Sequence, residues 1–391
     1  MNFALSAAQE AVAARAWRFA REEVAPRARA ADEAGVFPLD LVGRMAALGF
    51  LAGPVAPELG GAGMDYVSFA LVYEALGWAD SSVRGFVSVH GGLVTLCIRD
   101  HGTDEQRRRL VPALARGEII GCYGLTEPEA GSDAGALRAT ARRDGDGWVL
   151  DGEKIWITNG GIAQLAIVFA RDPAIETDRP GRQICAFLVP TDTPGFRAEP
   201  MPGRPLGHRA ADHAVLRLDG CRVPGAALLG GHGEGFRVAM SGLDHGRLGV
   251  AAGALGAAQA CLEASVGFAR RRRAFGRTIG EFEMIQAALA DMAADVDAAR
   301  LVVYRAAWLK DQGVPTTRET SIAKLFAVEA ALRAADQAVL IHGGRGYSNE
   351  LPVERHWRDL KGLQIYEGTS HIQRIVIARH LLAAEAEEGH P

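Results

Sequence analysis

The first part of the chain places apolar residues at helical spacing. Ser6 and Gln9 form a capping box in front of an alanine-rich run in which charged residues alternate with apolar ones. Thr103 and Gln106 form a second box in front of another run of this kind. Glycine- and proline-rich stretches at residues 53–54 and 58–63 interrupt the helical pattern between them. The pattern predicts an N-terminal helical domain over residues 1–120.

The spacing of apolar residues changes near residue 121. Residues 148–150 and 155–158 are strand-like and flank Asp151-Gly152, a dipeptide typical of a hairpin turn. Further strand-like runs, separated by prolines, occupy residues 166–170, 184–189 and 214–218. We expect a small all-β middle domain over residues 121–230.

Long helical patterns return in the last part of the chain. They cover residues 247–270, 282–309, 317–340 and 370–384. Four long amphipathic helices predict an antiparallel bundle, here assigned to residues 231–391. The expected fold class is therefore mostly α with a β insert.

Composition narrows the class of protein. The 391 residues are 48% hydrophobic and 23% charged, with a formal net charge of -4, as in a soluble globular protein. No basic tail or stripe indicates a nucleic-acid partner. Five scattered cysteines without a CxxC pair argue against a disulfide framework or a metal site. The N-terminus does not resemble a signal peptide, and no run of about 18 apolar residues indicates a membrane span, so we expect a cytoplasmic protein without a membrane partner.

The first motif with candidate chemistry is the polar loop at residues 122–133. Thr126 and Ser132 supply hydroxyl groups, and Gly131 permits close approach of the backbone to a ligand. Such a loop suits a cofactor with polar ring edges and phosphates. The alternative is a turn-rich linker without a ligand.

Two further motifs contain aromatic and cationic residues. In residues 154–161, Trp156 can stack on an aromatic ring and Thr158 can bind its edge, although a strand tryptophan by itself is more often a core residue. In residues 268–276, Arg272 precedes Phe275 at an expected helix end, where a guanidinium can bind a pyrophosphate. The alternative is a solvated cationic helix terminus.

The fourth motif ends with Glu367. This residue follows two apolar residues and precedes Gly-Thr-Ser, where a helix is expected to start near Thr369 or Ser370. A carboxylate in apolar surroundings becomes a stronger base when a ligand expels water. The alternative is an acidic residue that only favours the helix N-terminus.

Together these motifs, in this order and spacing, resemble the acyl-CoA dehydrogenase family over essentially the whole chain. The resemblance implies a helical N-terminal domain, a β-barrel-like middle domain and a C-terminal four-helix bundle. It also implies FAD in an extended form at a subunit interface, and a dimer or a dimer of dimers. An acyl thioester, carried by CoA or by a carrier protein, is the implied substrate, and an electron-transfer flavoprotein the implied partner.

The resemblance also implies roles for single residues. The residues expected around the flavin ring are Tyr123, Leu125, Thr126, Trp156 and Thr158, with Ser132 at the junction of flavin and substrate and Thr369 also on the flavin. The residues expected at the phosphates and adenine of a neighbouring subunit's FAD are Arg272, Phe275, Gly343 and Gly344. Asp244 and Arg247 match positions that line the thioester channel.

Within this resemblance, Glu367 is the base that removes the proton next to the thioester carbonyl while a hydride leaves the β-carbon. A backbone N–H and a flavin hydroxyl polarise the carbonyl. One subgroup of the family carries its base just before the residue that matches Arg247, but Gly246 stands there and cannot serve. Glu367 is therefore the base candidate that the family pattern offers.

Some positions depart from the family pattern. They concern the adenosine end of the cofactor and its surroundings, and they are Ala274, Glu283, Leu340 and His371.

Arg84 resembles an arginine of glutaryl-CoA dehydrogenases and of dehydrogenases that make hydroxymalonyl carrier-protein units. In the glutaryl enzymes it meets the distant carboxylate of the substrate. The alternative for Arg84 is a surface arginine that pairs with a neighbouring acid.

Two other functions remain open at the level of sequence. One is a flavin oxidase or monooxygenase that uses molecular oxygen, although monooxygenase relatives usually lack the glutamate at position 367. The other is a non-catalytic helical protein that has lost its flavin, which the four departures favour and the retained Thr126, Thr158, Arg272 and Glu367 oppose.

Overall fold

Helices with polar caps build the first part of the fold. The computed structural model describes residues 3–388. Both predicted capping boxes are confirmed, at Ser6–Gln9 and at Thr103–Gln106. The helices are α1 (Ala7–Phe19), α2 (Ala25–Ala34), α3 (Asp40–Ala47), α4 (Tyr66–Ala79), α5 (Ser81–Val87), α6 (Leu96–His101) and α7 (Asp104–Ala115). Two π-helical segments, η1 (Ala20–Val24) and η3 (Ser88–Thr95), extend α1 and α5.

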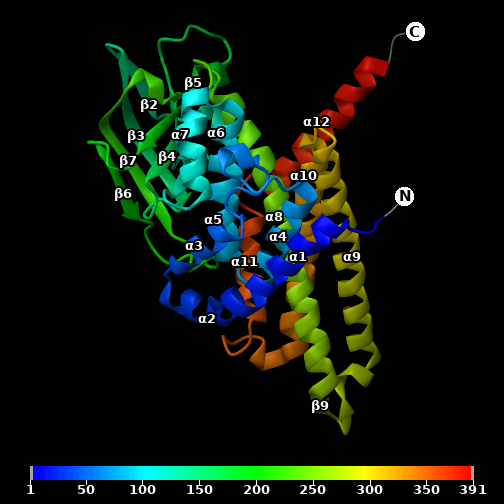
Figure 1. The fold of residues 1–391 in the computed structure, drawn as a ribbon. Coiled ribbons are helices and arrows are strands. Elements are labelled where there is room, and N and C mark those ends of the chain that lie inside the picture. Colours follow the sequence, from blue (N-terminus) through cyan, green and yellow to red (C-terminus); the bar gives the residue numbers. More distant parts are fainter. Residues whose placement is uncertain (1–2, 389–391) are drawn as a thin grey trace.

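An eight-stranded sheet follows these helices. Its strands are β1 (Gly121–Gly124), β2 (Thr140–Asp144), β3 (Gly147–Thr158), β4 (Leu165–Arg171), β5 (Ile184–Pro190), β6 (Phe196–Pro200), β7 (His213–Val223) and β8 (Leu228–Leu229). The order is β6-β7-β3-β2-β4-β5-β8, and β1 pairs in parallel with β4. Figure 1 shows the sheet at one side of the molecule, with α6 and α7 beside it.

The hairpin predicted at Asp151-Gly152 is wrong. Strand β3 runs through this dipeptide, and a shift in its pairing with β7 between Leu150 and Gly152 marks an irregularity instead. Gly152 has φ 144°, and a Cβ there would lie 2.6 Å from the Cβ of Ala139, so a side chain does not fit. The turn lies a few residues earlier, at Gly145 between β2 and β3, where Asp144 pairs with Gly147.

Long helices form the last part of the fold. They are α8 (Gly235–Arg271), α9 (Glu283–Asp311), α10 (Thr317–His342) and α12 (Ser370–Glu388). Helix α8 begins twelve residues before the predicted start at 247, and a further helix, α11 (Val353–Leu363), was not predicted. A short hairpin, β9 (Arg273–Ala274) and β10 (Arg277–Thr278), joins α8 to α9 at the far end of the molecule (Figure 1).

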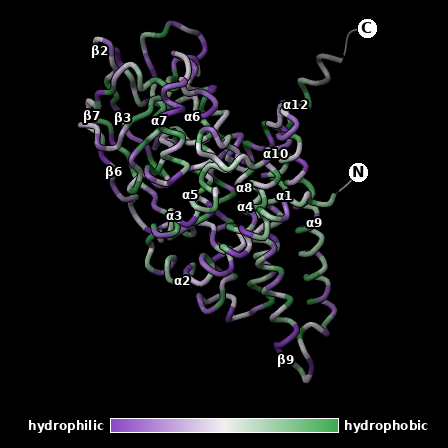
Figure 2. Tube along the Cα trace, viewed as in Figure 1, coloured by the Kyte–Doolittle hydropathy of each residue, from purple (hydrophilic) through white to green (hydrophobic). Residues whose placement is uncertain are grey.

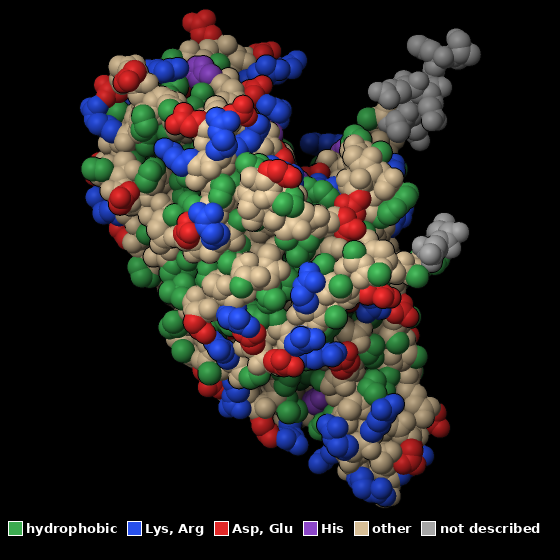
Figure 3. Space-filling view, in the orientation of Figure 1, with side chains coloured by type: hydrophobic (Ala, Val, Ile, Leu, Met, Phe, Trp, Pro, Cys, Tyr) green, Lys and Arg blue, Asp and Glu red, His purple; other side chains and the backbone are tan. Residues whose placement is uncertain are grey.

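Helix α8 is the central packing element, since it contacts α10, α4 and α9. Two helical stretches, Ser81–His101 and Gly235–Arg271, have the length and composition of a membrane span, but 94% and 72% of their most apolar windows are buried in the fold, as in core helices. Polar and apolar positions alternate along the outer helix α9 (Figure 2). On the face shown in Figure 3, basic and acidic side chains are mixed.

Candidate active site

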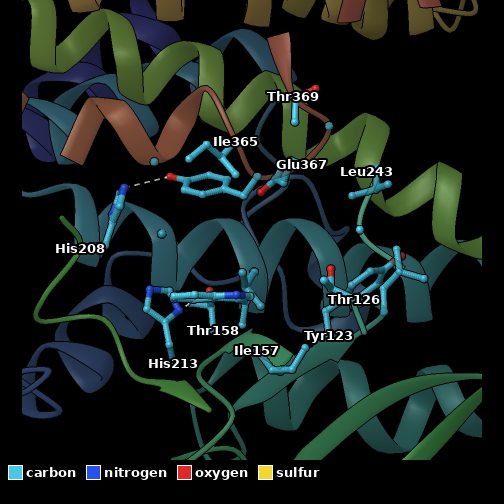
Figure 4. Close-up of a pocket in the computed structure, with 18 of the residues that line it drawn as sticks. Tyr123, Thr126, Ile157, Thr158, His208, His213, Leu243, Ile365, Glu367 and Thr369 are labelled. Atoms are coloured by element: carbon cyan, nitrogen blue, oxygen red, sulfur yellow. Dashed lines mark hydrogen bonds between the residues drawn. The ribbon is translucent and has the colours of Figure 1, made fainter. Parts of the chain in front are cut away.

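One cavity of about 520 Å³ lies where the N-terminal helices, the sheet and the segment after α11 meet. Most of its lining is apolar, with a few polar groups. The predicted site residues in its wall are Arg84, Tyr123, Leu125, Thr126, Ser132, Trp156, Thr158, Arg247, Glu367 and Thr369. Figure 4 shows Glu367 and Thr369 on one side of the cavity, opposite Thr126, Ile157 and Thr158. The fold thus brings together residues that are more than 280 positions apart in the sequence.

Glu367 lies in the turn between α11 and α12. Thr369 caps α12, as predicted, because its Oγ1 accepts a hydrogen bond from the N–H of Ile372 at 3.2 Å. Glu367 itself has φ 54°, an uncommon value for a residue with a side chain. Its Oε1 accepts a hydrogen bond from Ser88 Oγ at 3.4 Å, whereas its buried Oε2 has no partner among the described residues. Burial raises the pKa of Glu367, and the positive charges of Lys324, Arg84 and Arg247 oppose that rise.

Gly246 makes room for this carboxylate. A Cβ at position 246 would lie 2.0 Å from Glu367 Oε2 and 2.7 Å from its Cδ. A side chain at position 246 and the carboxylate of Glu367 therefore compete for the same space.

The wall opposite Glu367 is formed by the loop after β1 and the end of β3. Tyr123 is buried, and its hydroxyl donates to the carbonyl of Ala239 at 3.0 Å. Thr158 Oγ1 lies 3.2 Å from Nδ1 of His213, and burial lowers the pKa of that histidine to about 4. The imidazole is therefore neutral near pH 7. The hydroxyl of Thr126 makes no hydrogen bond to the described residues, so it is free to bind a ligand in the cavity.

Trp156 is not a core residue. Its side chain is 51% exposed and stands in the cavity wall with φ 58°, so the interpretation of this strand tryptophan as core is wrong. Trp148, earlier on the same strand, occupies the core with 1% exposure. Of these two tryptophans of β3, only Trp156 has its ring accessible from the cavity.

A buried ion pair supports the loop that carries Thr126. Lys154 Nζ lies 2.6 Å from Glu127 Oε1 and donates to the carbonyl of Leu125 at 3.3 Å. Glu127 also accepts from the backbone N–H groups of Arg138 and Ala139, at 2.5 and 2.9 Å. Burial lowers the pKa of Lys154 to about 8. These contacts fix both ends of the segment that contains the exposed Ser132.

Arg84 is completely buried in the wall of the cavity. The interpretation as a surface arginine is wrong. Its Nη2 donates to the hydroxyl of Tyr366, its guanidinium lies 5.8 Å from the centre of that ring, and its Nε has no partner among the described residues. A Cβ at Gly253 would lie 2.7 Å from Arg84 Cδ, so this glycine provides the space for the side chain.

The hydroxyl of Tyr366 also lies 3.3 Å from Nε2 of His208, as the dashed line in Figure 4 marks. Burial lowers the pKa of His208 to about 3, so it is neutral near pH 7. No carboxylate of the described residues lies within ion-pair distance of Arg84. The guanidinium therefore retains unused hydrogen-bonding capacity beside the cavity.

Asp244 lies beside the main cavity. It accepts hydrogen bonds from Thr320 Oγ1 at 3.0 Å and Arg247 Nη1 at 3.4 Å. It lines a second cavity of about 420 Å³ that shares Met240 and Arg247 with the first. The residues that line the second cavity are Arg237, Met240, Ser241, Asp244, Arg247, Thr317, Val376, Arg379 and His380.

Four predicted site residues lie away from both cavities. Arg272 follows the end of α8, and Phe275 occupies the tip of the β9–β10 hairpin with 95% exposure. Gly343 and Gly344 follow α10. Figure 1 shows the hairpin at the end of the molecule farthest from the sheet. Within one chain the structure does not bring these residues to the site.

Three polar residues near Glu367 were missed by the sequence reasoning. They are Ser88, Lys324 and Gln373, and each contacts Glu367 or the backbone beside it. One sequence feature could have identified Lys324: it is the single charged residue in an otherwise apolar helical run, Ile-Ala-Lys-Leu-Phe. A buried lysine in such a run needs partners, which are found 42 and 44 residues later in the sequence.

Three family models match the chain in succession. They describe the acyl-CoA dehydrogenase N-terminal domain at residues 6–118, the middle domain at residues 122–221 and the C-terminal domain at residues 233–382. A short-chain specific mitochondrial acyl-CoA dehydrogenase of Homo sapiens is 45% identical over 366 residues, which cover 93% of this chain and 87% of the relative. A probable acyl-CoA dehydrogenase of Bacillus subtilis is 44% identical over 383 residues, which cover 98% of this chain and 100% of the relative.

Solved structures share the fold over nearly the whole length. Butyryl-CoA dehydrogenase from Megasphaera elsdenii matches with a TM-score of 0.94 and 37% identity, covering 98% of this chain and 100% of that one. Glutaryl-CoA dehydrogenase from Mycobacterium smegmatis in complex with FADH2 matches with 0.92 and 34%, covering 97% and 95%. A chain in the structure of the electron transferring flavoprotein of Acidaminococcus fermentans matches with 0.94 and 39%, covering 98% and 100%.

Proposed function

Because the chain belongs to the acyl-CoA dehydrogenase family, we propose that it dehydrogenates an acyl thioester with Glu367 as the catalytic base. The protein is an oxidoreductase, and FAD is its cofactor. The observation that carries the proposal is the Glu367 carboxylate, which lines the cavity with one buried oxygen atom unpartnered among the described residues. A carboxylate in this state is ready to accept a proton.

The residues present fit the flavin end of FAD. The exposed face of Trp156 offers a stacking surface, and the Thr126 hydroxyl makes no hydrogen bond within the described chain. Thr158 lies on the same wall. Bound there, FAD supplies the acceptor for the β-hydrogen of the substrate and its two electrons. We propose Tyr123, Leu125, Thr126, Ser132, Trp156, Thr158 and Thr369 as the residues that hold it in this chain.

Glu367 acts on the α-carbon of the bound thioester. Its carboxylate accepts the α-proton, and the apolar cavity excludes water, so the base is stronger than a solvated glutamate. The backbone N–H of Glu367 makes no hydrogen bond to the described residues, and we propose it as the donor that polarises the thioester carbonyl. A donor aimed at the oxygen where negative charge develops stabilises the transition state more than the substrate.

Arg84 favours a second, narrower candidate function, the dehydrogenation of a carboxylated acyl unit. A completely buried guanidinium without a carboxylate partner is costly unless something in the cavity satisfies it. A substrate carboxylate has the charge and the fork geometry that a guanidinium prefers. An acyl unit with a terminal carboxylate, as in glutaryl thioesters, is one substrate of this class, and CoA or a carrier protein can carry it.

The second cavity fits the carrier part of the thioester. Arg237, Arg379 and His380 surround it, and Arg247 connects it to the main cavity. These groups suit the phosphates that CoA and the phosphopantetheine arm of a carrier protein share.

We further propose an electron-transfer flavoprotein as electron acceptor. A cytoplasmic location stays a prediction, since the relatives include both mitochondrial and bacterial enzymes.

Anaerobic reduction of the bound flavin by a panel of thioesters tests this function. The panel contains acyl-CoA and acyl-carrier substrates with and without a terminal carboxylate, and bleaching of the flavin absorbance is the signal. At least one thioester should bleach the flavin, and the reduced enzyme should react slowly with oxygen. Rapid reoxidation by oxygen would instead indicate an oxidase, and no bleaching by any thioester would contradict the proposal.

A further inference from the structure

Lys324 is a buried cation directly behind the turn that carries Glu367. It lies on α10 with 2% exposure. Its Nζ donates hydrogen bonds to the carbonyl oxygens of Tyr366 and Gly368, the residues on either side of Glu367. An ammonium on a helix thus binds both neighbours of the proposed base.

The turn requires such support because its backbone is in an uncommon conformation. Glu367 has φ 54°, in the left-handed region that residues with a side chain rarely adopt. Gln373 on α12, also fully buried, donates from Nε2 to the carbonyls of Glu367 and Gly368 at 3.2 and 2.9 Å. Two buried side chains therefore bind three consecutive carbonyl oxygens, and this fixes the direction in which the carboxylate points.

Lys324 also contributes charge, which Gln373 does not. Burial lowers the pKa of Lys324 to about 7, so its ammonium acts on Glu367 below that pH. Positive charges act on Glu367 from three helices: Arg84 on α5, Arg247 on α8 and Lys324 on α10. The other titratable neighbours among the described residues are Tyr73 on α4, Tyr123 on β1 and Tyr366 in the turn itself. Burial raises the pKa of each, so all three are neutral near pH 7. Arg84 and Arg247 bind other partners, Tyr366 and Asp244, whereas Lys324 binds the Glu367 turn itself.

We propose that Lys324 is a positioning residue for the dehydrogenation: its ammonium holds the turn in place and keeps the carboxylate of Glu367 ionised for removal of the α-proton. This inference rests on the proposed role of Glu367 as the base. It assigns two separable effects to one side chain, because the hydrogen bonds set geometry and the charge sets the ionisation of the base.

The test compares Lys324→Met with Gln373→Met in the FAD-loaded enzyme. The rate of anaerobic flavin reduction is measured as a function of pH, and the carboxyl infrared band assigned with Glu367→Gln is titrated in parallel. An opposite charge close to a carboxylate lowers its pKa by about 1–3 units. Lys324→Met should therefore shift both titrations of Glu367 to higher pH by about one unit or more, because the removed charge favoured the ionised form.

The maximal rate constant of Lys324→Met should also fall by about 10- to 100-fold through misplacement of the base, with little change in KM. Gln373→Met should lower the rate without shifting the pH profile, because it removes hydrogen bonds and no charge. If Lys324→Met does not fold, Lys324→Gln retains a donor to the carbonyls and should still shift the titration.

An unchanged infrared titration and pH profile in a folded Lys324 variant would overturn the inference. So would an equal shift in Gln373→Met, because the effect would then come from geometry alone. If Glu367→Gln itself reduced the flavin at a normal rate, the proposed base would be wrong, and that outcome is distinguishable from a failure of Lys324 alone.

Discussion

Arg84 combines complete burial with the absence of a carboxylate partner among the described residues. If the substrate carries a second carboxylate, loss of the Arg84 guanidinium that pairs with it lowers the binding free energy by about 2–5 kcal/mol. We therefore expect Arg84→Ala to weaken carboxylated thioesters by roughly 30-fold or more, and plain straight-chain thioesters by little. Arg84→Lys should recover only part of the loss, because an ammonium lacks the paired fork.

Substrate titrations with both thioester classes provide the measurement. Equal losses for carboxylated and plain substrates would show that Arg84 is structural. The enzyme would then be an ordinary short- or medium-chain acyl-CoA dehydrogenase.

The roles of single residues were predictable where a sequence motif identifies them. They were not predictable where the role depends on how deeply the folded chain buries the side chain. The position of Glu367 before a helix cap was evident from Gly-Thr-Ser, and the cap at Thr369 is confirmed. For Trp156 the strand pattern alone favoured a core residue, and only the family resemblance predicted a position at the cofactor; the residue lines the cavity with 51% exposure. The partners of Lys324 lie on a turn distant in sequence, so no local pattern revealed them.

At the level of elements, strand β3 supports the loop before it through Lys154. Lys154→Met leaves Glu127 buried without its cation, and the loss of one partner of a buried pair costs about 3–5 kcal/mol. We expect a lower thermal midpoint and a lower FAD content, because the loop with Thr126 and Ser132 loosens. Thermal unfolding and the ratio of flavin to protein absorbance measure both effects.

The double variant Lys154→Met/Glu127→Gln is the matched control. It removes both charges and should be less destabilised than the single variant. A single variant as stable and as flavin-loaded as the parent protein would show that the pair does not hold the loop.

Elements with strong periodicity or caps were predictable, whereas turn positions in the sheet were not. The sequence contains three Asp-Gly dipeptides close together, at 144–145, 146–147 and 151–152, and local turn chemistry alone does not separate them. The pairing of β3 with both β2 and β7 decides, because a long strand between two partners passes through Asp151-Gly152. Helix α11 was missed because its short amphipathic pattern lies between glycine-rich segments.

At the level of the whole molecule, the β9–β10 hairpin exposes Phe275 far from the cavities of its own chain. A phenylalanine with 95% of its surface exposed fits an interface with a second copy. We expect an FAD-loaded dimer or tetramer with one flavin per subunit, in which Phe275→Ala lowers FAD content. Val36→Ala, which alters another exposed apolar residue, should leave FAD content unchanged.

Sedimentation together with flavin absorbance checks the assembly. A stable monomer that retains its flavin would contradict the expected role of Arg272 and Phe275.

The order of helical, β and helical parts was predictable from periodicity, and the family models cover the three parts in that order. An assembly of the expected kind depends on contacts with a second chain, which neither periodicity nor a single subunit reveals.

The proton acceptor is the central claim, and Glu367→Gln tests it most directly. The amide keeps the shape of the side chain and can accept the hydrogen bond from Ser88, but it cannot take up the α-proton. Loss of a general base costs about 10²–10⁴-fold in rate. The account predicts that the variant retains FAD and that anaerobic flavin reduction by a competent thioester slows by at least about 100-fold. Flavin reduction at a near-normal rate in the FAD-loaded variant would contradict it and show that another group removes the proton.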